Sequence, residues 1–172
     1  MDLEEKIINQ KLIYKGSFLE IINVDVNLPD GSNTSRDIVK HPGATAIIAF
    51  LDEENIILVE QFRLPLNRVM LEIPAGKLNK NEEIIECARR ELQEETGYRA
   101  KNMEYLGCIA TAPGFCDEII YLYKATDLTL GDKCEDEDEF TNVKILNINT
   151  VKEMIKKGEI IDGKTISMFS YL

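Results

Sequence analysis

The 172-residue chain contains one histidine, four cysteines and no long hydrophobic run. His41 precedes a Pro-Gly pair, so we interpret it as a turn residue, and mechanisms that require two histidines are excluded. The cysteines are too far apart along the chain for a zinc site or a thioredoxin-like motif, and we expect them to be reduced. They are Cys87, Cys108, Cys116 and Cys134.

The chain also lacks membrane and export signals. No segment approaches the roughly 20 consecutive apolar residues that a membrane-spanning helix requires. Residues 1–6 are polar and acidic, without the basic-then-apolar layout of a signal peptide. We therefore expect a cytoplasmic protein without membrane contacts.

Basic residues are scarce relative to acidic ones. The chain has 31 acidic and 20 basic residues, a formal net charge of −11, and no strong basic patch. This charge repels a nucleic-acid backbone, so we do not expect nucleic-acid binding. A small anionic substrate could bind only if metal cations neutralise both the substrate and the protein. The length fits one domain with a small appendage.

Hydrophobic patterning divides the chain near residue 42. Three β-like runs, with turns at 15–16 and 29–31, predict a small antiparallel sheet over residues 1–42. Residues 43–172 mix hairpin-forming strands with helices, which predicts an α+β fold, a mixed sheet sandwiched by helices. The expected strands are 11–14, 18–26, 35–39, 44–50, 56–62, 69–73, 103–110, 119–124 and 140–146. The expected helices are 81–96, 150–157 and 164–172.

The helix expected at 81–96 carries carboxylates on its apolar side. At 100° per residue, Glu91 and Glu95 lie within about 20° of the apolar stripe. Carboxylates at i, i+4 repel each other, and desolvating them is costly unless a cation compensates. Hard divalent cations prefer such oxygens, which favours a metal site over an acidic solvated helix. The stripe consists of Ile84, Ile85, Ala88 and Leu92, and the solvated face of Glu86, Arg90 and Gln93.

The spacing in this region resembles the Nudix box. It spans 23 residues and nine specified positions, which makes a chance match very improbable. The positions are Gly76, Glu82, Arg90, Glu91, Leu92, Glu94, Glu95, Gly97 and the apolar Tyr98. Segments 60–63, 71–76 and 112–118 resemble the ADP-ribose pyrophosphatase branch, and Pro113 lies sixteen residues after Gly97. The resemblance implies a Nudix-type α/β/α sandwich and a homodimer formed through the amino-terminal sheet.

The same resemblance implies a metal site for Mg²⁺ or Mn²⁺. Glu91 and Glu95 would be metal ligands, Glu94 would assist them, and the backbone carbonyl of Ala75 would complete the coordination. Glu82 and Arg90 would brace the loop and the helix.

Substrate-binding and catalytic roles follow from the resemblance as well. Arg63 would grip a substrate phosphate, and the segment containing Pro113, Gly114, Phe115 and Glu118 would close over the diphosphate. Taken alone, Arg63 could be a surface arginine on an edge strand, and the segment an ordinary turn. For the catalytic base, Glu139 is the first choice and Glu137 the second, with Glu94 also a catalytic candidate. The acidic run 135–139 could equally be a solvated loop.

The implied activity is metal-dependent hydrolysis of a nucleoside diphosphate derivative, and ADP-ribose is the favoured substrate. Its products would be AMP and ribose 5-phosphate. A nucleotide-sugar pyrophosphatase acting on GDP-mannose is the nearest alternative, because the metal ligands contact only the diphosphate. A Nudix module that binds ADP-ribose without cleaving it is a further alternative. Such modules typically lose box glutamates, whereas this chain retains all of them.

Overall fold

The computed structural model describes residues 3–132 and 140–172. Contacts divide the chain into two compact units. The first comprises Met1–Gly43 and Ala110–Ile119, and the second comprises Ala44–Ile109 and Ile120–Leu172. The division expected at residue 42 does not include the segment 110–119 in the first unit.

The first unit is built on a three-stranded antiparallel sheet. Its strands are β1 (Lys6–Lys15), β2 (Glu20–Asn27) and β3 (Asn33–Lys40), in the order β1-β2-β3. Gly31, in the turn between β2 and β3, has a φ of 86°, a value that glycine tolerates better than other residues. The small antiparallel sheet expected at the amino terminus is therefore confirmed.

Residues 110–119 are bonded to β3 of this unit. The Val39 N–H donates to the Phe115 carbonyl at 2.7 Å, and the Asp117 N–H donates to the Val39 carbonyl at 3.1 Å. The Asp117 side chain accepts a hydrogen bond from the His41 N–H at 2.8 Å and forms an ion pair with Lys40. Backbone and side-chain contacts thus hold the segment.

The second unit contains a seven-stranded mixed sheet, in which β4 and β9 are parallel. The main order is β10-β5-β4-β9-β8, while β6 pairs with β5 and β7 with β4. The strands are β4 (Ala44–Phe50), β5 (Asn55–Arg63), β6 (Arg68–Glu72), β7 (Ala75–Lys77), β8 (Tyr98–Ala110), β9 (Ile119–Leu130) and β10 (Thr141–Asn147). The helices are η1 (Leu64–Leu66), α1 (Ile84–Thr96), α2 (Ile148–Lys156) and α3 (Gly163–Met168).

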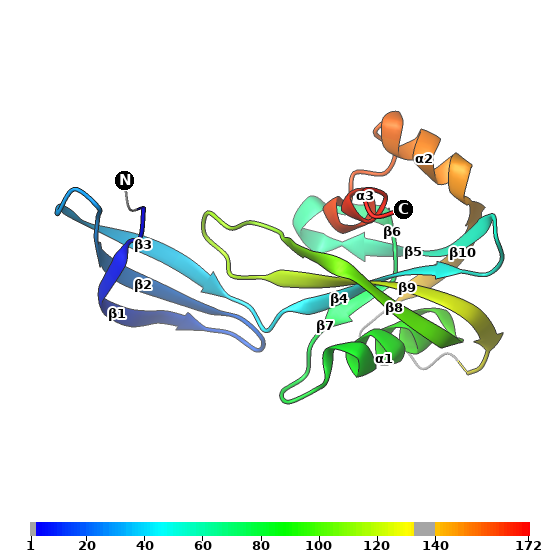
Figure 1. The fold of residues 1–172 in the computed structure, drawn as a ribbon, viewed down its shortest axis with the longest axis horizontal. Coiled ribbons are helices and arrows are strands. Elements are labelled where there is room, and N and C mark those ends of the chain that lie inside the picture. Colours follow the sequence, from blue (N-terminus) through cyan, green and yellow to red (C-terminus); the bar gives the residue numbers. More distant parts are fainter. Residues whose placement is uncertain (1–2, 133–139) are drawn as a thin grey trace. The chain divides into compact units, whose positions relative to one another are not determined.

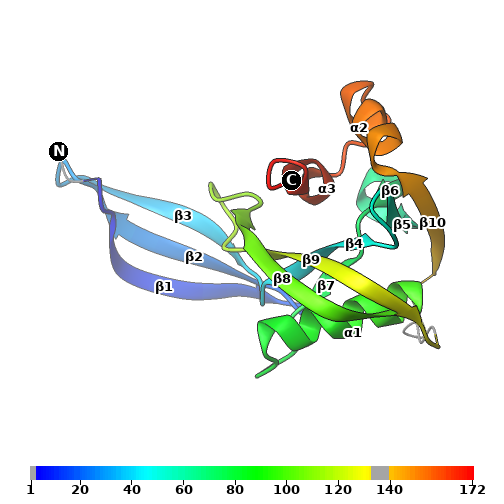
Figure 2. The same cartoon turned by 45° about the vertical axis from the view of Figure 1, so that its right-hand side comes forward.

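Helices cover both faces of this sheet, because alternate residues of its central strands point to opposite sides. Ile48 packs in a cluster with Val151 of α2 and Met168 of α3. Its neighbour Ile47 packs in a second cluster with Leu92 of α1. In Figure 1, α1 lies on one side of the sheet and α2 and α3 lie on the other. Figure 2 shows the same layering after a 45° turn. The expected α/β/α sandwich is confirmed.

Element ends differ from the prediction where backbone geometry intervenes. Helix α1 begins at Ile84 rather than at 81, because Asn81 has a φ of 64° and interrupts the helix there. It ends as expected at Gly97, whose φ is 78°. Helix α3 stops at Met168, short of residue 172. The short strand β7 and the turn η1 were not predicted.

No helix among the described residues has both the length and the apolar character needed to cross a membrane.

Candidate active site

Helix α1 places two carboxylates inside the second unit. Glu91 is 7% exposed and Glu95 is 3% exposed, on the side of the helix that packs against the sheet. The predicted stripe is present, since Ala88 and Leu92 are fully buried. One turn of helix separates the glutamates, so both carboxylates lie on the same side.

The loop that enters β7 lies directly against these carboxylates. The Ala75 N–H donates to Glu95 Oε2 at 3.0 Å. A Cβ atom on Gly76 would lie 1.9 Å from Glu91 Cδ, so a side chain at residue 76 would displace the Glu91 carboxylate. The backbone at 75–76 and the two glutamates therefore line one common site.

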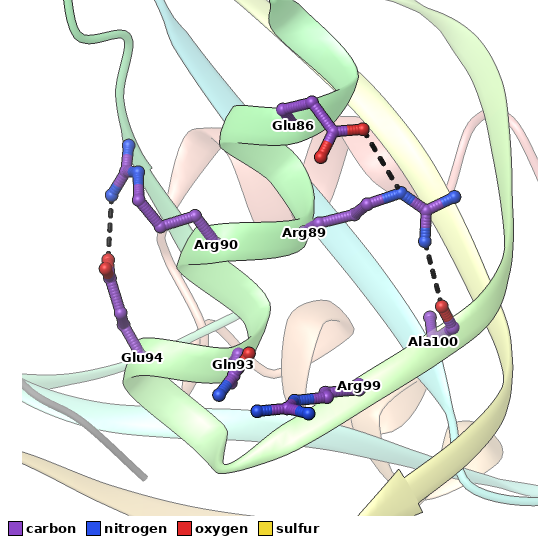
Figure 3. Close-up of a pocket in the computed structure, with 7 residues that line it drawn as sticks. All are labelled: Glu86, Arg89, Arg90, Gln93, Glu94, Arg99 and Ala100. Atoms are coloured by element: carbon purple, nitrogen blue, oxygen red, sulfur yellow. Dashed lines mark hydrogen bonds and ion pairs between the residues drawn. The ribbon is translucent and has the colours of Figure 1, made fainter. Parts of the chain in front are cut away.

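The guanidinium of Arg90 contacts three acidic side chains around this site. Its guanidinium forms ion pairs with Glu82 at 2.8 Å, with Glu91 at 2.7 Å and with Glu94 at 2.7 Å. Figure 3 shows the pair with Glu94. Arg90 lies on the same face of α1 as Glu86 and Gln93, as expected, and lines a surface pocket with them. Its side chain is 27% exposed because three carboxylates draw it against the helix.

The contacts of Glu82 tie the loop to the helix. The Asn79 N–H donates to Glu82 Oε2 at 2.9 Å, and Arg90 Nη2 donates to the Lys77 carbonyl at 3.1 Å. The hydrogen bond from Arg90 lowers the pKa of Glu82 to about 2. The hydrogen bond to Glu82 in turn raises the pKa of Arg90. Both groups are therefore charged at neutral pH.

The chemistry of this donor set suits a hard divalent cation. It consists of the carboxylate oxygens of Glu91 and Glu95 beside the Ala75 backbone, which are the oxygen ligands that Mg²⁺ prefers. Within residues 3–132 and 140–172, no three His, Cys, Asp or Glu side chains form a cluster that could hold a metal by themselves. Backbone or substrate oxygens would have to complete the coordination.

Arg63 lies at the end of β5 and is paired with Glu72. Its Nε donates to Glu72 Oε1 at 2.9 Å, and its Nη2 donates to Oε2 at 2.7 Å. The Arg63 side chain is 39% exposed, whereas that of Glu72 is 2% exposed. The hydrogen bond that Arg63 donates to Glu72 raises the pKa of Arg63, and the charge of Glu95 adds to this effect. Arg63 therefore belongs to the same electrostatic neighbourhood as the α1 carboxylates.

The expected substrate segment lies in the first unit. Phe115 is 59% exposed, and residues 113–119 help to line a cavity of about 590 Å³ together with Glu5, Arg36 and Ile38. Glu118 accepts a hydrogen bond from Thr111 Oγ1 at 2.6 Å and lies 3.3 Å from His41 Nδ1. His41, which we interpreted as a turn residue, thus also contacts an acidic side chain.

Other candidate residues lie outside the described part of the chain, and some contacts were not foreseen. The proposed bases Glu137 and Glu139, and Cys134, belong to residues 133–139, which the structure does not describe.

Sequence reasoning missed Lys164, which pairs with Glu72. Its position in the carboxyl-terminal helix gives no local signal of this contact, because the two residues are 92 positions apart.

Family comparison agrees with this geometry. The model of the NUDIX domain family matches residues 40–169. The chain belongs to this family. As a Nudix hydrolase it is a member of a group of enzymes that generally depend on divalent metals. The predicted family membership is confirmed.

Three relatives illustrate the range of activities among similar Nudix proteins. The chain is 45% identical over 172 residues to an ADP-ribose pyrophosphatase of Bacillus subtilis (strain 168), covering 99% of this chain and 93% of the relative. It is 45% identical over 171 residues to a methanol dehydrogenase activator of Bacillus methanolicus, covering 98% and 92%. A GDP-mannose pyrophosphatase of Yersinia pestis (strain Pestoides F) is 33% identical, covering 75% and 69%.

A solved structure supports the fold independently of sequence similarity. The crystal structure of an ADP compounds hydrolase superposes with a TM-score of 0.87 at 18% identity, covering 99% of this chain and 94% of the other. At this identity the likeness establishes the architecture, a Nudix sandwich with a small additional sheet.

Proposed function

We propose that this protein hydrolyses the pyrophosphate bond of ADP-ribose to give AMP and ribose 5-phosphate. The observation that carries the proposal is the burial of Glu91 and Glu95 against the backbone at Ala75 and Gly76. Support for the substrate comes from the 45% identity with an ADP-ribose pyrophosphatase over 99% of the chain.

In this proposal the carboxylates of Glu91 and Glu95 and the Ala75 carbonyl hold Mg²⁺, with Mn²⁺ as the alternative ion. When bound, the ion neutralises the diphosphate charge and lowers the pKa of a coordinated water. Glu94 assists from its position beside Arg90. Arg90 and Glu82 keep the helix and the loop in register through their ion pair of 2.8 Å.

The remaining roles concern the substrate and the proton. Arg63 binds a phosphate with the part of its guanidinium that Glu72 does not use. Residues 113–115 and Glu118 contact the substrate. Glu139, or else Glu137, accepts the proton of the attacking water as the phosphate-bearing half leaves.

The amino-terminal sheet is proposed to join two copies of the chain in the cytoplasm. Every residue of β1 is exposed, including apolar ones that a monomer would leave in water. These are Ile7, Ile8, Leu12, Ile13 and Tyr14, each more than half exposed. Exposed apolar side chains on an edge strand are a surface on which another chain can pair. Light scattering of the intact protein and of a Leu12→Glu variant tests this, with the variant expected to be monomeric.

One experiment separates the candidate functions. The purified protein is incubated with Mg²⁺ and either ADP-ribose or GDP-mannose, and the released nucleotide is identified. AMP release from ADP-ribose at the higher kcat/KM supports the proposal, whereas faster GMP release from GDP-mannose favours the nucleotide-sugar alternative. Tight binding of ADP-ribose without any product favours a sensing module.

A second candidate function rests on the equally similar relative from Bacillus methanolicus, a methanol dehydrogenase activator. This chain would then stimulate a dehydrogenase. Adding the protein and its Glu95→Gln variant to a methanol dehydrogenase assay tests the idea. Stimulation by wild type supports it, and its loss in the variant would link the effect to hydrolysis.

A further inference from the structure

A continuous network of polar contacts connects β6 to the start of α3, next to the candidate active site. Lys164 donates to Glu72 Oε2 and, at 3.0 Å, to Asp162 Oδ1. Asp162 Oδ2 accepts from the Thr165 N–H at 2.9 Å and from the Thr165 hydroxyl at 2.5 Å. The Thr165 hydroxyl oxygen accepts from the Ile73 N–H at 2.9 Å. The network therefore returns to Ile73, which directly follows β6 and lies two residues before Ala75.

The network contains two acidic and two basic side chains, so its charges balance. The acids are Glu72 and Asp162, and the bases are Arg63 and Lys164. The side chains of Glu72, Lys164 and Asp162 are 2%, 10% and 14% exposed. Burial alone would raise the pKa of Glu72, but the hydrogen bond from Arg63 and the charge of Lys164 outweigh it and lower the pKa. Glu72 is therefore a buried carboxylate that depends on two cations.

Arg63 is the only member of this network that reaches far into solvent, at 39% exposed. Glu72 engages its Nε and Nη2 atoms. Among the described residues, Nη1 has no hydrogen-bond partner, so that side of the guanidinium can bind a second anion. A guanidinium has five N–H donors, enough for a carboxylate on one edge and a phosphate on the other.

We propose that Lys164 is a positioning residue for the substrate diphosphate: it neutralises Glu72, so that Arg63 retains both its orientation and a positive charge that a phosphate can use. The idea rests on the proposed function. With Asp162 included, the four charged side chains of the network sum to zero. Without Lys164 their net charge is −1, and an incoming phosphate is repelled by the two carboxylates as well as attracted by Arg63.

The first test compares Lys164→Met with Lys164→Arg. The matched control is Lys156→Met, which removes an exposed lysine that pairs only with Glu153 on α2. For Lys164→Met we expect KM for ADP-ribose to rise about tenfold or more while kcat changes by less than about threefold. Lys164→Arg retains the charge and should keep KM within about threefold of wild type. An unchanged KM in a folded Lys164→Met variant would overturn the proposal.

A second variant separates charge compensation from a purely structural role. In Glu72→Gln/Lys164→Met the buried carboxylate and its second cation are removed together, so the net charge of the network returns to the wild-type value of zero. We expect KM to return towards the wild-type value, with the thermal midpoint monitored in parallel. If the midpoint recovers but KM stays high, Lys164 supports the fold and does not tune Arg63.

A binding measurement tests the inference independently of catalysis. Inorganic pyrophosphate is titrated into wild type, Lys164→Met and Lys156→Met without added metal, using calorimetry. Weaker binding only in Lys164→Met supports the inference even if the wild type hydrolyses none of the tested diphosphates, an outcome that would defeat the proposed function alone. Equal binding by both variants, or none by wild type, would overturn the inference.

Discussion

Two groups of buried acids in the second unit differ in how their charge is compensated. Glu72 receives a bidentate arginine and a lysine. On α1, by contrast, the guanidinium of Arg90 pairs with three carboxylates, those of Glu82, Glu91 and Glu94. The first arrangement is balanced, as expected of a group that orders the structure. The second concentrates negative charge beside the backbone at Ala75, as expected of a site that receives a cation.

Replacing Glu95 with Gln should have the largest effect on activity. The change removes a buried charge next to Ala75 and keeps the shape of the side chain, so we expect kcat to fall by about a thousandfold or more with the fold intact. Initial rates with ADP-ribose and Mg²⁺, together with circular dichroism, test this. Glu86→Gln, on the exposed face of the same helix, is the control. Near-normal rates in Glu95→Gln would contradict the metal-ligand assignment.

Replacing Glu72 with Gln should instead have its main effect on stability. Two cations would lose their buried carboxylate, and breaking one side of such an ion pair costs about 3 kcal/mol. Urea denaturation measures the loss. Glu20→Gln removes an exposed pair with Lys15 and should cost less than about 1 kcal/mol. Equal losses in the two variants would show that the Glu72 network is no stronger than a surface pair.

Gly76→Ala tests the contact between loop and helix at the α1 site. The added Cβ would overlap Glu91 Cδ, so the loop or the glutamate must move, at a cost of about 1–3 kcal/mol and with loss of hydrolysis. Gly163→Ala is the control, because nothing lies within 4 Å of its Cβ position. Thermal midpoints and rates are compared. Full activity in Gly76→Ala would mean that Glu91 need not lie against this loop.

Protonation of Glu82 in acid should have the smallest effect, a modest loss of stability. The folded-state pKa of Glu82 is about 2, against an ordinary value of 4.5. Because the pKa is depressed, the stabilisation is present above about pH 4.5 and is lost as pH falls towards 2. In Glu82→Gln the thermal midpoint should therefore be lower than wild type at pH 6, with the difference shrinking below pH 4. A constant difference across this range would contradict the ion pair with Arg90.

Much of the fold and part of the site could be predicted because their signals are local. A continuous apolar run, bounded by Pro42-Gly43 and the turn at 52–55, predicts strand β4 to the residue. The helical period correctly predicts that Glu91 and Glu95 lie on the buried side of α1. It also places Arg90 on the face of Glu86 and Gln93, but periodicity assigns only a direction and cannot show that Arg90 pairs with three acids.

The amino-acid sequence by itself determined most of the strands, the helix of the Nudix box, the placement of its two buried glutamates and the family to which the chain belongs. Only the tertiary structure decided that Lys164 meets Glu72 across 92 positions, and that residues 110–119 bond to β3. The physical reason is the separation along the chain over which each kind of interaction acts. Backbone periodicity acts between residues a few positions apart, whereas these contacts form only after packing has brought distant segments together.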